Sequence, residues 1–203
     1  MKERGVTLVE LIVVISVISI LVIAMGFSYI SWQGAYRAEK ATKDLYADLM
    51  EARTMAMTQG RMCFADFNSP VPPPGSGRYR IACDPVLNDD GQGDIDSNGV
   101  IDAGHEFLES INPKTVDYPI IFGGAGTIID FGKSGIVQLE DPAALPNWSL
   151  CLTMPVNLTY EVIPDYDCIN ISQTRINMGK LRTSILNGGD CRPSEIGGDC
   201  AAK

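Results

Sequence analysis

The chain has almost no histidine, a residue that many active sites and transition-metal centres require. It contains a single histidine, His105, among 203 residues. That leaves no Ser-His-Asp or Cys-His arrangement beyond chance and no histidine cluster for a transition metal. None of its six cysteines forms a CxxC pair, so the usual zinc and thioredoxin spacings are missing as well. We therefore expect a protein that is not an enzyme and that requires no cofactor.

Charge is missing from one long stretch near the start. Residues 11–30 contain no Asp, Glu, Lys or Arg, and a helix of that length spans roughly 30 Å, the thickness of a bilayer core. Many of these residues are β-branched, but in lipid the backbone must satisfy its own hydrogen bonds, which favours a helix. The run is longer than the apolar core of a secretory signal peptide, and no Ala-x-Ala site follows it. It predicts a transmembrane helix over residues 6–30.

One acidic residue stands inside this apolar segment, behind a very short leader. The leader, residues 1–5, ends at Gly5, and Glu10 follows five positions later. A carboxylate in lipid costs about 2.5–3.5 kcal/mol on insertion scales. Glu10 therefore needs a partner, unless it lies at the level of the lipid headgroups.

Residues 5–14, GVTLVELIVV, resemble the N-terminal motif of type IV pilins and type II secretion pseudopilins. The resemblance implies that a prepilin peptidase cleaves after Gly5 and that the new amino terminus, Val6, is N-methylated. It also implies that Glu10 pairs with the terminal amine of a neighbouring subunit when the helix enters a fibre. The chain departs from the family's usual pattern at Val6, where Phe or Met is commoner, and in having no proline before Pro70.

The helix is expected to continue through residues 31–60, where an apolar stripe recurs at helical spacing and Gly60 supplies a stop signal. The members of the stripe are Leu45, Leu49, Ala52 and Ala56. Residues 61–203 instead show short apolar runs between turn residues and no second periodic helix of useful length. We predict an α+β fold in which one long N-terminal helix packs on a mainly antiparallel β head.

The head is expected to form nine short strands, two pairs of them joined by tight turns at 132–135 and 178–180. The strands are 61–67, 78–83, 115–122, 127–131, 136–139, 148–154, 168–171, 174–177 and 181–186. This order is similar to the GspH/FimT branch of pseudopilins and minor pilins, firmly over residues 1–60 and loosely over 61–186.

That resemblance implies a minor pilin or pseudopilin that assembles through its N-terminal helix into a type IV pilus or a type II secretion pseudopilus. Its partners would be other pilin or pseudopilin subunits, the prepilin peptidase and an inner-membrane assembly platform. It would stay in the inner membrane with a periplasmic head until it enters the fibre. A DNA-binding competence minor pilin and a major structural pilin remain as alternatives.

All six cysteines lie in the head. An even number of cysteines after a membrane segment indicates three disulfides in an oxidising compartment. Many pairings are open to six cysteines, and their spacing does not choose among them. We favour pairing between neighbours in the sequence, namely Cys63 with Cys83, Cys151 with Cys168 and Cys191 with Cys200.

The head also carries the whole excess of acid, with 10 Lys and Arg against 19 Asp and Glu in residues 61–203. Within it, oxygen-bearing side chains recur at alternate positions with Gly99 at the sixth, as in a calcium loop. These side chains are Asp94, Asp96, Asn98 and Asp102. The twelfth position is His105 where a calcium loop has a bidentate Glu. The pattern therefore fits either a calcium site outside an EF-hand or a solvated turn.

One basic cluster, Arg175, Lys180 and Arg182, stands in this acidic head. Some DNA-uptake minor pilins of the GspH/FimT type carry a similar basic turn near the C-terminus, so the resemblance makes these residues the candidate DNA contact. On a head with a net charge of −9 such a contact would be weak and sensitive to salt. An ordinary hairpin also explains the residues, and nucleic acid is not an expected partner.

Overall fold

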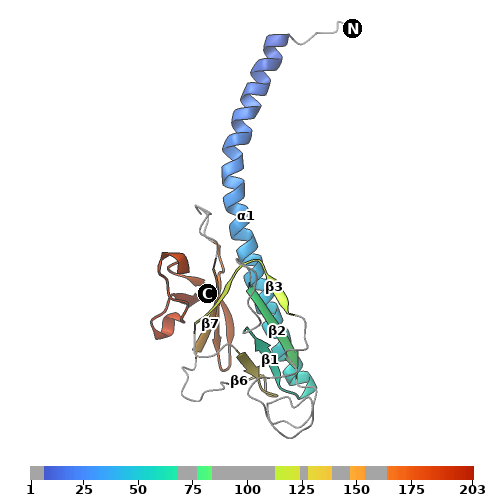
Figure 1. Cartoon of the computed structure of the whole chain (residues 1–203), viewed down its shortest axis with the longest axis vertical. Coiled ribbons are helices and arrows are strands. Elements are labelled where there is room, and N and C mark those ends of the chain that lie inside the picture. Colours follow the sequence, from blue (N-terminus) through green and yellow to red (C-terminus); the bar gives the residue numbers. More distant parts are fainter. Residues whose placement is uncertain (1–6, 68–76, 84–112, 124–127, 139–146, 154–163) are drawn as a thin grey trace.

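A long helix projects from a head built of two antiparallel β-sheets, as the computed structural model shows (Figure 1). The structure describes residues 7–67, 77–83, 113–123, 128–138, 147–153 and 164–203, with only the backbone at 24–31, 147 and 186. This combination of one helix and antiparallel sheets confirms the α+β prediction for the described residues.

Helix α1 runs from Leu8 to Gln59 without a break. It begins at Thr7, which has extended backbone angles and caps the first turn. It ends where Gly60 adopts the left-handed conformation (φ 63°), with the Gly60 N–H donating to the Ala56 carbonyl. The predicted helix end at Gly60 is therefore confirmed, because glycine can adopt this conformation without a steric penalty.

The second half of α1 packs on the head through a stripe of residues that alternate in steps of three and four. The stripe comprises Ala35, Ala38, Thr42, Leu45, Leu49, Ala52 and Ala56, all of them buried. The four residues predicted from the sequence are among them. Since most members are small, the backbone of α1 lies close to the strands at 63–66, 77–83, 128–131, 168–172 and 176–181.

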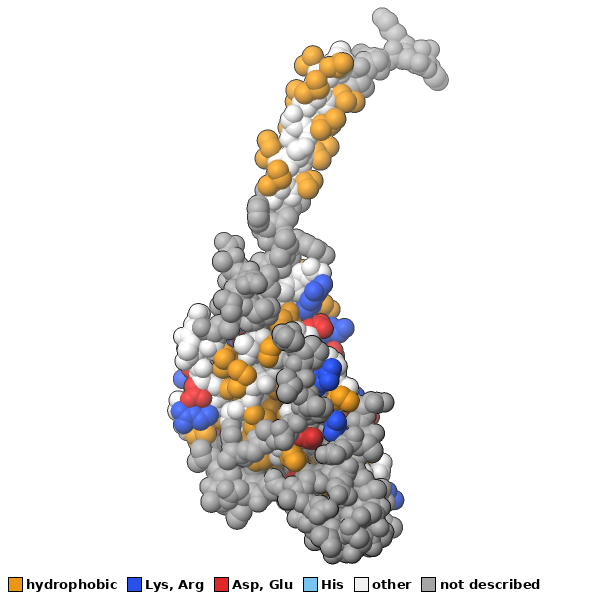
Figure 2. Space-filling model, viewed as in Figure 1, with side chains coloured by type: hydrophobic (Ala, Val, Ile, Leu, Met, Phe, Trp, Pro, Cys, Tyr) orange, Lys and Arg blue, Asp and Glu red, His pale blue; other side chains and the backbone are white. Residues whose placement is uncertain are grey.

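The first half of α1 is different, because its apolar side chains have no head against them. Every large apolar side chain in residues 8–23 is more than half exposed. Figure 2 shows this segment as an apolar column that extends beyond the head. Within the described residues, no helix combines the length and the apolar character that a membrane crossing needs.

Sheet 1 contains five strands in the order β3-β2-β1-β5-β6. Their bounds are β1 Cys63–Asp66, β2 Gly77–Cys83, β3 Lys114–Val116, β5 Ile128–Phe131 and β6 Val137–Gln138. The turn between β5 and β6 was predicted at 132–135. It is closed there by the Gly132 N–H, which donates to the Ile136 carbonyl at 2.9 Å, and Gly135 takes a positive φ of 72°.

Sheet 2 contains five strands in the order β10-β9-β8-β7-β4. Their bounds are β4 Ile120–Gly123, β7 Asn147–Leu152, β8 Cys168–Ser172, β9 Ile176–Leu181 and β10 Cys200–Ala202. Two short 3-10 turns, η1 Ile185–Asn187 and η2 Ser194–Ile196, lie between β9 and β10.

The two sheets meet around α1 and share one apolar core with it. The chain crosses from β3 in sheet 1 to β4 in sheet 2, and the Val137 N–H of β6 donates to the Gln173 carbonyl beyond β8 at 2.8 Å. The core residues Ile129 and Phe131 come from sheet 1, and Leu150, Ile169 and Ile171 come from sheet 2. Burying such large side chains contributes about 1.5–3 kcal/mol each, so this shared core positions α1.

The single strand predicted at 115–122 is wrong, because Pro119 divides it. Proline has no N–H to donate to a strand ladder, and the chain changes sheets at this point. β3 and β4 are therefore separate strands.

The predicted turn at 178–180, with strands on either side, is also wrong. β9 runs straight through it. Gly179 is required there for another reason, since a Cβ at this position would lie 2.6 Å from the Ala201 carbonyl oxygen of β10. A glycine within a strand can mark a close approach between backbones instead of a turn, and β10 itself was not predicted.

Candidate functional site

The first turn of α1 holds Glu10 in a reciprocal cap with Thr7. The Glu10 N–H donates to Thr7 Oγ1 at 3.3 Å, and the Thr7 N–H donates to Glu10 Oε2 at 3.4 Å. The Thr7 hydroxyl lies 3.5 Å from the same carboxylate oxygen. This arrangement is a capping box, and it places a negative side chain at the positive end of the helix dipole.

The cap gives Glu10 polar partners inside its own chain. The sequence-based hypothesis supplied only one partner, the terminal amine of a neighbouring subunit, which a single chain does not test. Gly5 and Val6, the predicted cleavage and methylation positions, lie outside the described residues. The cap itself was readable from the sequence, because Thr followed three residues later by Glu before an apolar run is its signature.

An aromatic pair stands on α1 where the helix approaches the head. Trp32 and Tyr36 are 55% and 56% exposed, and their rings stack with centroids 5.7 Å apart. Tryptophan and tyrosine gather at the boundary between lipid and water in membrane proteins. Sequence analysis missed this pair, although its spacing of four residues beyond the uncharged run was a visible signal.

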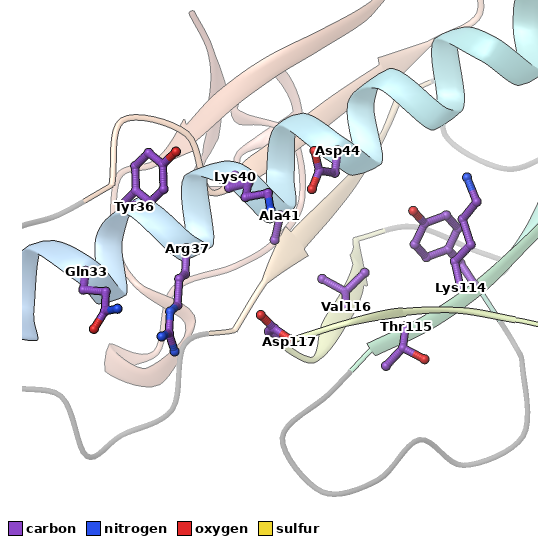
Figure 3. A pocket seen from close by; sticks show the side chains of 11 residues that line it. Gln33, Tyr36, Arg37, Lys40, Ala41, Asp44, Lys114, Thr115, Val116 and Asp117 are labelled. Carbon is purple, nitrogen blue, oxygen red and sulfur yellow. The ribbon is translucent and has the colours of Figure 1, made fainter.

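A pocket of about 880 Å³ opens beside this pair, between α1 and strand β3. Figure 3 shows Arg37 and Lys40 on the helix side and Lys114 and Asp117 on the strand side. Lys114 is held by Asp48, with its Nζ 2.8 Å from the Asp48 carboxylate. Sequence analysis did not find this pocket, because its walls come from segments about 75 positions apart in the chain, roughly residues 40 and 115.

The candidate calcium ligands Asp94, Asp96, Asn98 and Asp102 lie outside the described residues. Over the part of the chain that is described, no group of three or more His, Cys, Asp or Glu side chains could hold a metal ion. The calcium hypothesis therefore stays a prediction from the spacing of the residues.

The three residues of the candidate DNA contact are spread along strand β9 and its two ends. Arg175 precedes β9, Lys180 lies near its end, and Arg182 follows it. A strand rises about 3.3 Å per residue, so Arg175 and Arg182 are separated by roughly 20 Å. The turn expected around Lys180 is wrong, because Lys180 belongs to a strand, whereas the DNA contact itself stays a prediction.

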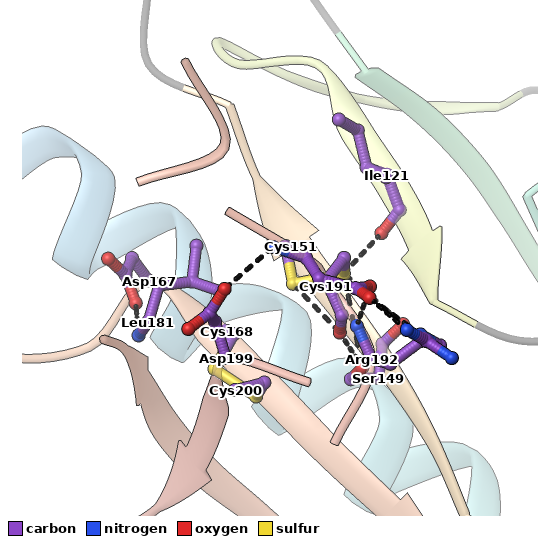
Figure 4. The surroundings of a disulfide bond; sticks show 11 residues. Ile121, Ser149, Cys151, Asp167, Cys168, Leu181, Cys191, Arg192, Asp199 and Cys200 are labelled. Carbon is purple, nitrogen blue, oxygen red and sulfur yellow. Dashed lines mark hydrogen bonds and ion pairs between the residues drawn. A yellow bond between two sulfur atoms is a disulfide. The ribbon is translucent and has the colours of Figure 1, made fainter. Parts of the chain in front are cut away.

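All six cysteines are paired, but only one of the three favoured pairs is correct. Cys63 is bonded to Cys83, its direct partner in the register between β1 and β2. The other two bonds join Cys151 to Cys191 and Cys168 to Cys200. Pairing between sequence neighbours fails here because residues 187–203, the C-terminal segment, fold back over sheet 2 (Figure 4).

The C-terminal segment forms a second apolar cluster on sheet 2, separate from the core against α1. The Ser149 hydroxyl of β7 donates to the Cys191 carbonyl. A Cβ on Gly123 of β4 would lie 2.5 Å from that carbonyl oxygen. Both contacts show how closely the segment lies on the sheet, and they give a structural role to residues that the sequence did not explain.

Beside this cluster, Asp167 is buried just before β8. It is 3% exposed, and its Oδ1 accepts a 2.6 Å hydrogen bond from the Leu181 N–H. Burial raises the pKa of the Asp167 carboxyl to about 6, although this hydrogen bond acts in the opposite direction. Nearby, the Lys203 ammonium lies 3.0 Å from Asp165 and lowers the pKa of that exposed carboxyl. The last residue of the chain is thus tied to the start of β8.

Comparison with known proteins finds a match for the N-terminal residues of the chain. A family model, the prokaryotic N-terminal methylation motif, matches residues 1–26. No curated protein and no solved structure matches the chain significantly. The matched residues include Gly5, Val6 and Glu10, and the motif is typical of type IV pilins and pseudopilins. It implies processing by a prepilin peptidase and assembly with other pilin subunits, and it supports a type IV pilin-like protein.

Proposed function

We propose that this chain is a non-enzymatic minor pilin or pseudopilin of the GspH/FimT type. Its N-terminal helix resides in the inner membrane with the head in the periplasm. From there the subunit enters a type IV pilus or a type II secretion pseudopilus. The observation that carries the proposal is the position of Glu10, a carboxylate held at the start of an otherwise apolar and exposed helical column.

The exposed column supports a role in assembly because it needs a cover. Covering one large apolar side chain is worth about 1.5–3 kcal/mol, and residues 8–23 carry many of them. In the described part of α1, the residues buried against the head begin at Gly34. Lipid would cover the column before assembly, and the helices of neighbouring subunits would cover it in the fibre.

Glu10 would set the register of that helix packing. Its cap with Thr7 lowers the cost of placing a carboxylate in lipid, because the N–H of Thr7 donates to it. A methylated amine arriving from a neighbouring subunit would then neutralise the charge. Only one axial position of the helix provides this pairing, so the acid selects one arrangement from many apolar ones.

The test has two parts, the first of which is mass analysis of the amino terminus after extraction from membranes. We expect a mature chain that starts at methylated Val6. In the second part, Glu10→Gln and Glu10→Ala variants are compared with the wild type for incorporation into fibres. Glu51→Gln is the matched control, since Glu51 is an exposed acid on the same helix, within the part that packs on the head.

We expect the two Glu10 variants to lose incorporation and the Glu51 variant to retain it. A mature protein that still carries residues 1–5 would contradict the proposal. Glu10 variants that enter fibres as efficiently as the wild type would contradict it equally.

A further inference from the structure

The pocket between α1 and β3 contains charged groups that have no ion pair. Within the described chain, neither Arg37 nor Lys40 forms a salt bridge, and neither does Asp117 across the pocket. Elsewhere on the same helix Lys43 is paired with Glu39, and on the strand side Lys114 is paired with Asp48. The pocket therefore gathers these three charged side chains in one place, and Asp44 of α1 also lines it.

The pocket lies at the end of the head from which the apolar column emerges. Arg37 follows the exposed Trp32 by five residues, or roughly 7–8 Å along the helix. The segment carrying Asp117 is held at the same level, because the hydroxyl of the next residue, Tyr118, donates to the Gly34 carbonyl at 3.3 Å. If Trp32 marks the edge of the hydrocarbon, Arg37 and the segment carrying Asp117 stand within the headgroup layer, which is about 5–8 Å deep on each side. Lys40 lies roughly 12 Å along the helix from Trp32 and reaches this layer with its long side chain.

The charges in this layer have the pattern of a zwitterionic headgroup. A phosphate suits two cations on adjacent turns of a helix, and an ammonium suits a carboxylate opposite them. A purely anionic headgroup would leave Asp117 without a counter-charge, and a purely cationic ligand would leave Arg37 and Lys40 without one. Long Arg and Lys side chains can also bend toward the membrane surface to reach a phosphate.

We propose that this pocket binds the headgroup of an ethanolamine phospholipid from the bilayer. Arg37 and Lys40 hold its phosphate, and Asp117 accepts hydrogen bonds from its ammonium. The proposal rests on the membrane location given under the proposed function and adds a specific lipid to it. Bound in this way, one lipid fixes the depth and rotation of the head before the subunit leaves the membrane.

The experiment uses the full chain, solubilised in a mild detergent. It is incubated with an equal mixture of ethanolamine, glycerol and choline phospholipids that share the same acyl chains. Native mass spectrometry then counts the lipids that each protein retains. For the wild type we expect ethanolamine lipid to be retained about tenfold more than either of the others, since each lost charge-assisted contact is worth about that factor.

Two variants separate the roles of the charges. Arg37→Ala/Lys40→Ala should retain every phospholipid about a hundredfold less, because two charge-assisted contacts to the phosphate are lost. Asp117→Asn should retain phospholipid but lose the preference for ethanolamine. Single Arg37→Gln and Lys40→Gln variants repeat the test if the double variant does not fold, as judged by its thermal melt.

Two control variants keep the charge change but move it away from the headgroup layer. Arg175→Ala removes a cation at the opposite end of the head, where Arg53 of α1 contacts the neighbouring Thr174 carbonyl. Glu51→Gln removes an exposed acid of the same helix, roughly 21 Å further along it from Arg37 and outside the pocket lining. Both should behave like the wild type.

Equal retention of the three lipids by the wild type would overturn the proposal. So would an Arg37→Ala/Lys40→Ala variant that retains lipid as the wild type does, including one that loses fibre incorporation, because the pocket would then serve a neighbouring subunit. None of these results depends on cleavage after Gly5 or on Glu10. A failure of lipid selection therefore leaves the proposed function standing, whereas unprocessed protein refutes the proposed function directly.

Discussion

Cys151 in β7 and Cys168 in β8 lie directly opposite each other in the sheet, yet each is bonded to a cysteine of the C-terminal segment. Two adjacent points on sheet 2 therefore hold the C-terminal segment in place. The segment has little regular structure of its own. Its position depends on these two bonds and on the close backbone contacts at Gly123 and Gly179.

Removing one of these bonds should loosen the C-terminal segment selectively. We expect Cys151→Ser/Cys191→Ser to lower the free energy of unfolding by about 2–4 kcal/mol. Hydrogen exchange should increase in residues 187–199 and β4, which the segment contacts. Cys63→Ser/Cys83→Ser is the matched control and should affect sheet 1 instead. Peptide mapping that finds Cys151 bonded to Cys168 in the native protein would contradict the arrangement.

Gly123 should tolerate no side chain, because the backbone of the C-terminal segment fills the space. We expect Gly123→Ala to destabilise the head by about 1–3 kcal/mol or more, since a carbonyl group and not a flexible side chain must move. Gly60→Ala is the comparison, because nothing lies within 4 Å of its Cβ position and only its positive φ opposes the change. That variant should lose about 1 kcal/mol. Thermal melts in which Gly123→Ala is the milder variant would refute this ranking.

Asp167 should make stability depend on pH in an unusual direction. Its folded pKa of about 6 lies above its ordinary value of 3.8, so the folded state binds the proton more tightly. The stability contributed by the protonated form is present below pH 4 and is lost as the pH rises through 6. Asp167→Asn keeps an oxygen for the Leu181 N–H and should be more stable than the wild type at pH 7, by on the order of 1–3 kcal/mol.

The two proteins should have similar stability near pH 4. Asp165→Asn is the control in which the effect on stability at pH 7 should be reversed. Lys203 lowers the pKa of Asp165, so that group stabilises the fold only when it is ionised. Urea unfolding at the two pH values measures both differences. A variant Asp167→Asn that is less stable than the wild type at pH 7 would show that the buried carboxylate is favourable.

Thr7 should matter to assembly through the orientation of Glu10. Thr7→Ala removes the hydroxyl that accepts the Glu10 N–H and should weaken the start of α1 by about 0.5–2 kcal/mol. We expect faster hydrogen exchange in the first turn and reduced incorporation into fibres. Thr7→Ser retains the hydroxyl and should resemble the wild type. If both variants are incorporated equally, the cap has no part in assembly.

Features set by local sequence could be predicted. The end of α1 at Gly60 depends on one glycine, and the turn at 132–135 depends on glycines at both of its ends. The buried stripe through Leu45 and Leu49 follows from helical spacing, because residues three and four positions apart lie on the same face of the helix. The motif around Glu10 was recognisable because it occupies a fixed place near the start of the chain.

Features set by contacts between distant segments could not be predicted. The role of Gly179 depends on β10, which lies about 20 residues later and has no pattern of its own. The bonds of Cys191 and Cys200 depend on how the C-terminal segment folds back, which cysteine spacing does not reveal. The pocket with Arg37 and Asp117 forms only when α1 and the segment after β3 pack together, and the sequence does not show that contact.

The N–H groups of Val137 in β6 and Cys200 in β10 are bonded to carbonyls of their own chain, at Gln173 and Arg192. These strands form one outer rim of each sheet, and an open rim invites strands from other molecules. With one donor of each edge strand occupied, these rims are less available for pairing with a strand of another head. At high local concentration, the subunits would therefore be less prone to aggregate through their β heads.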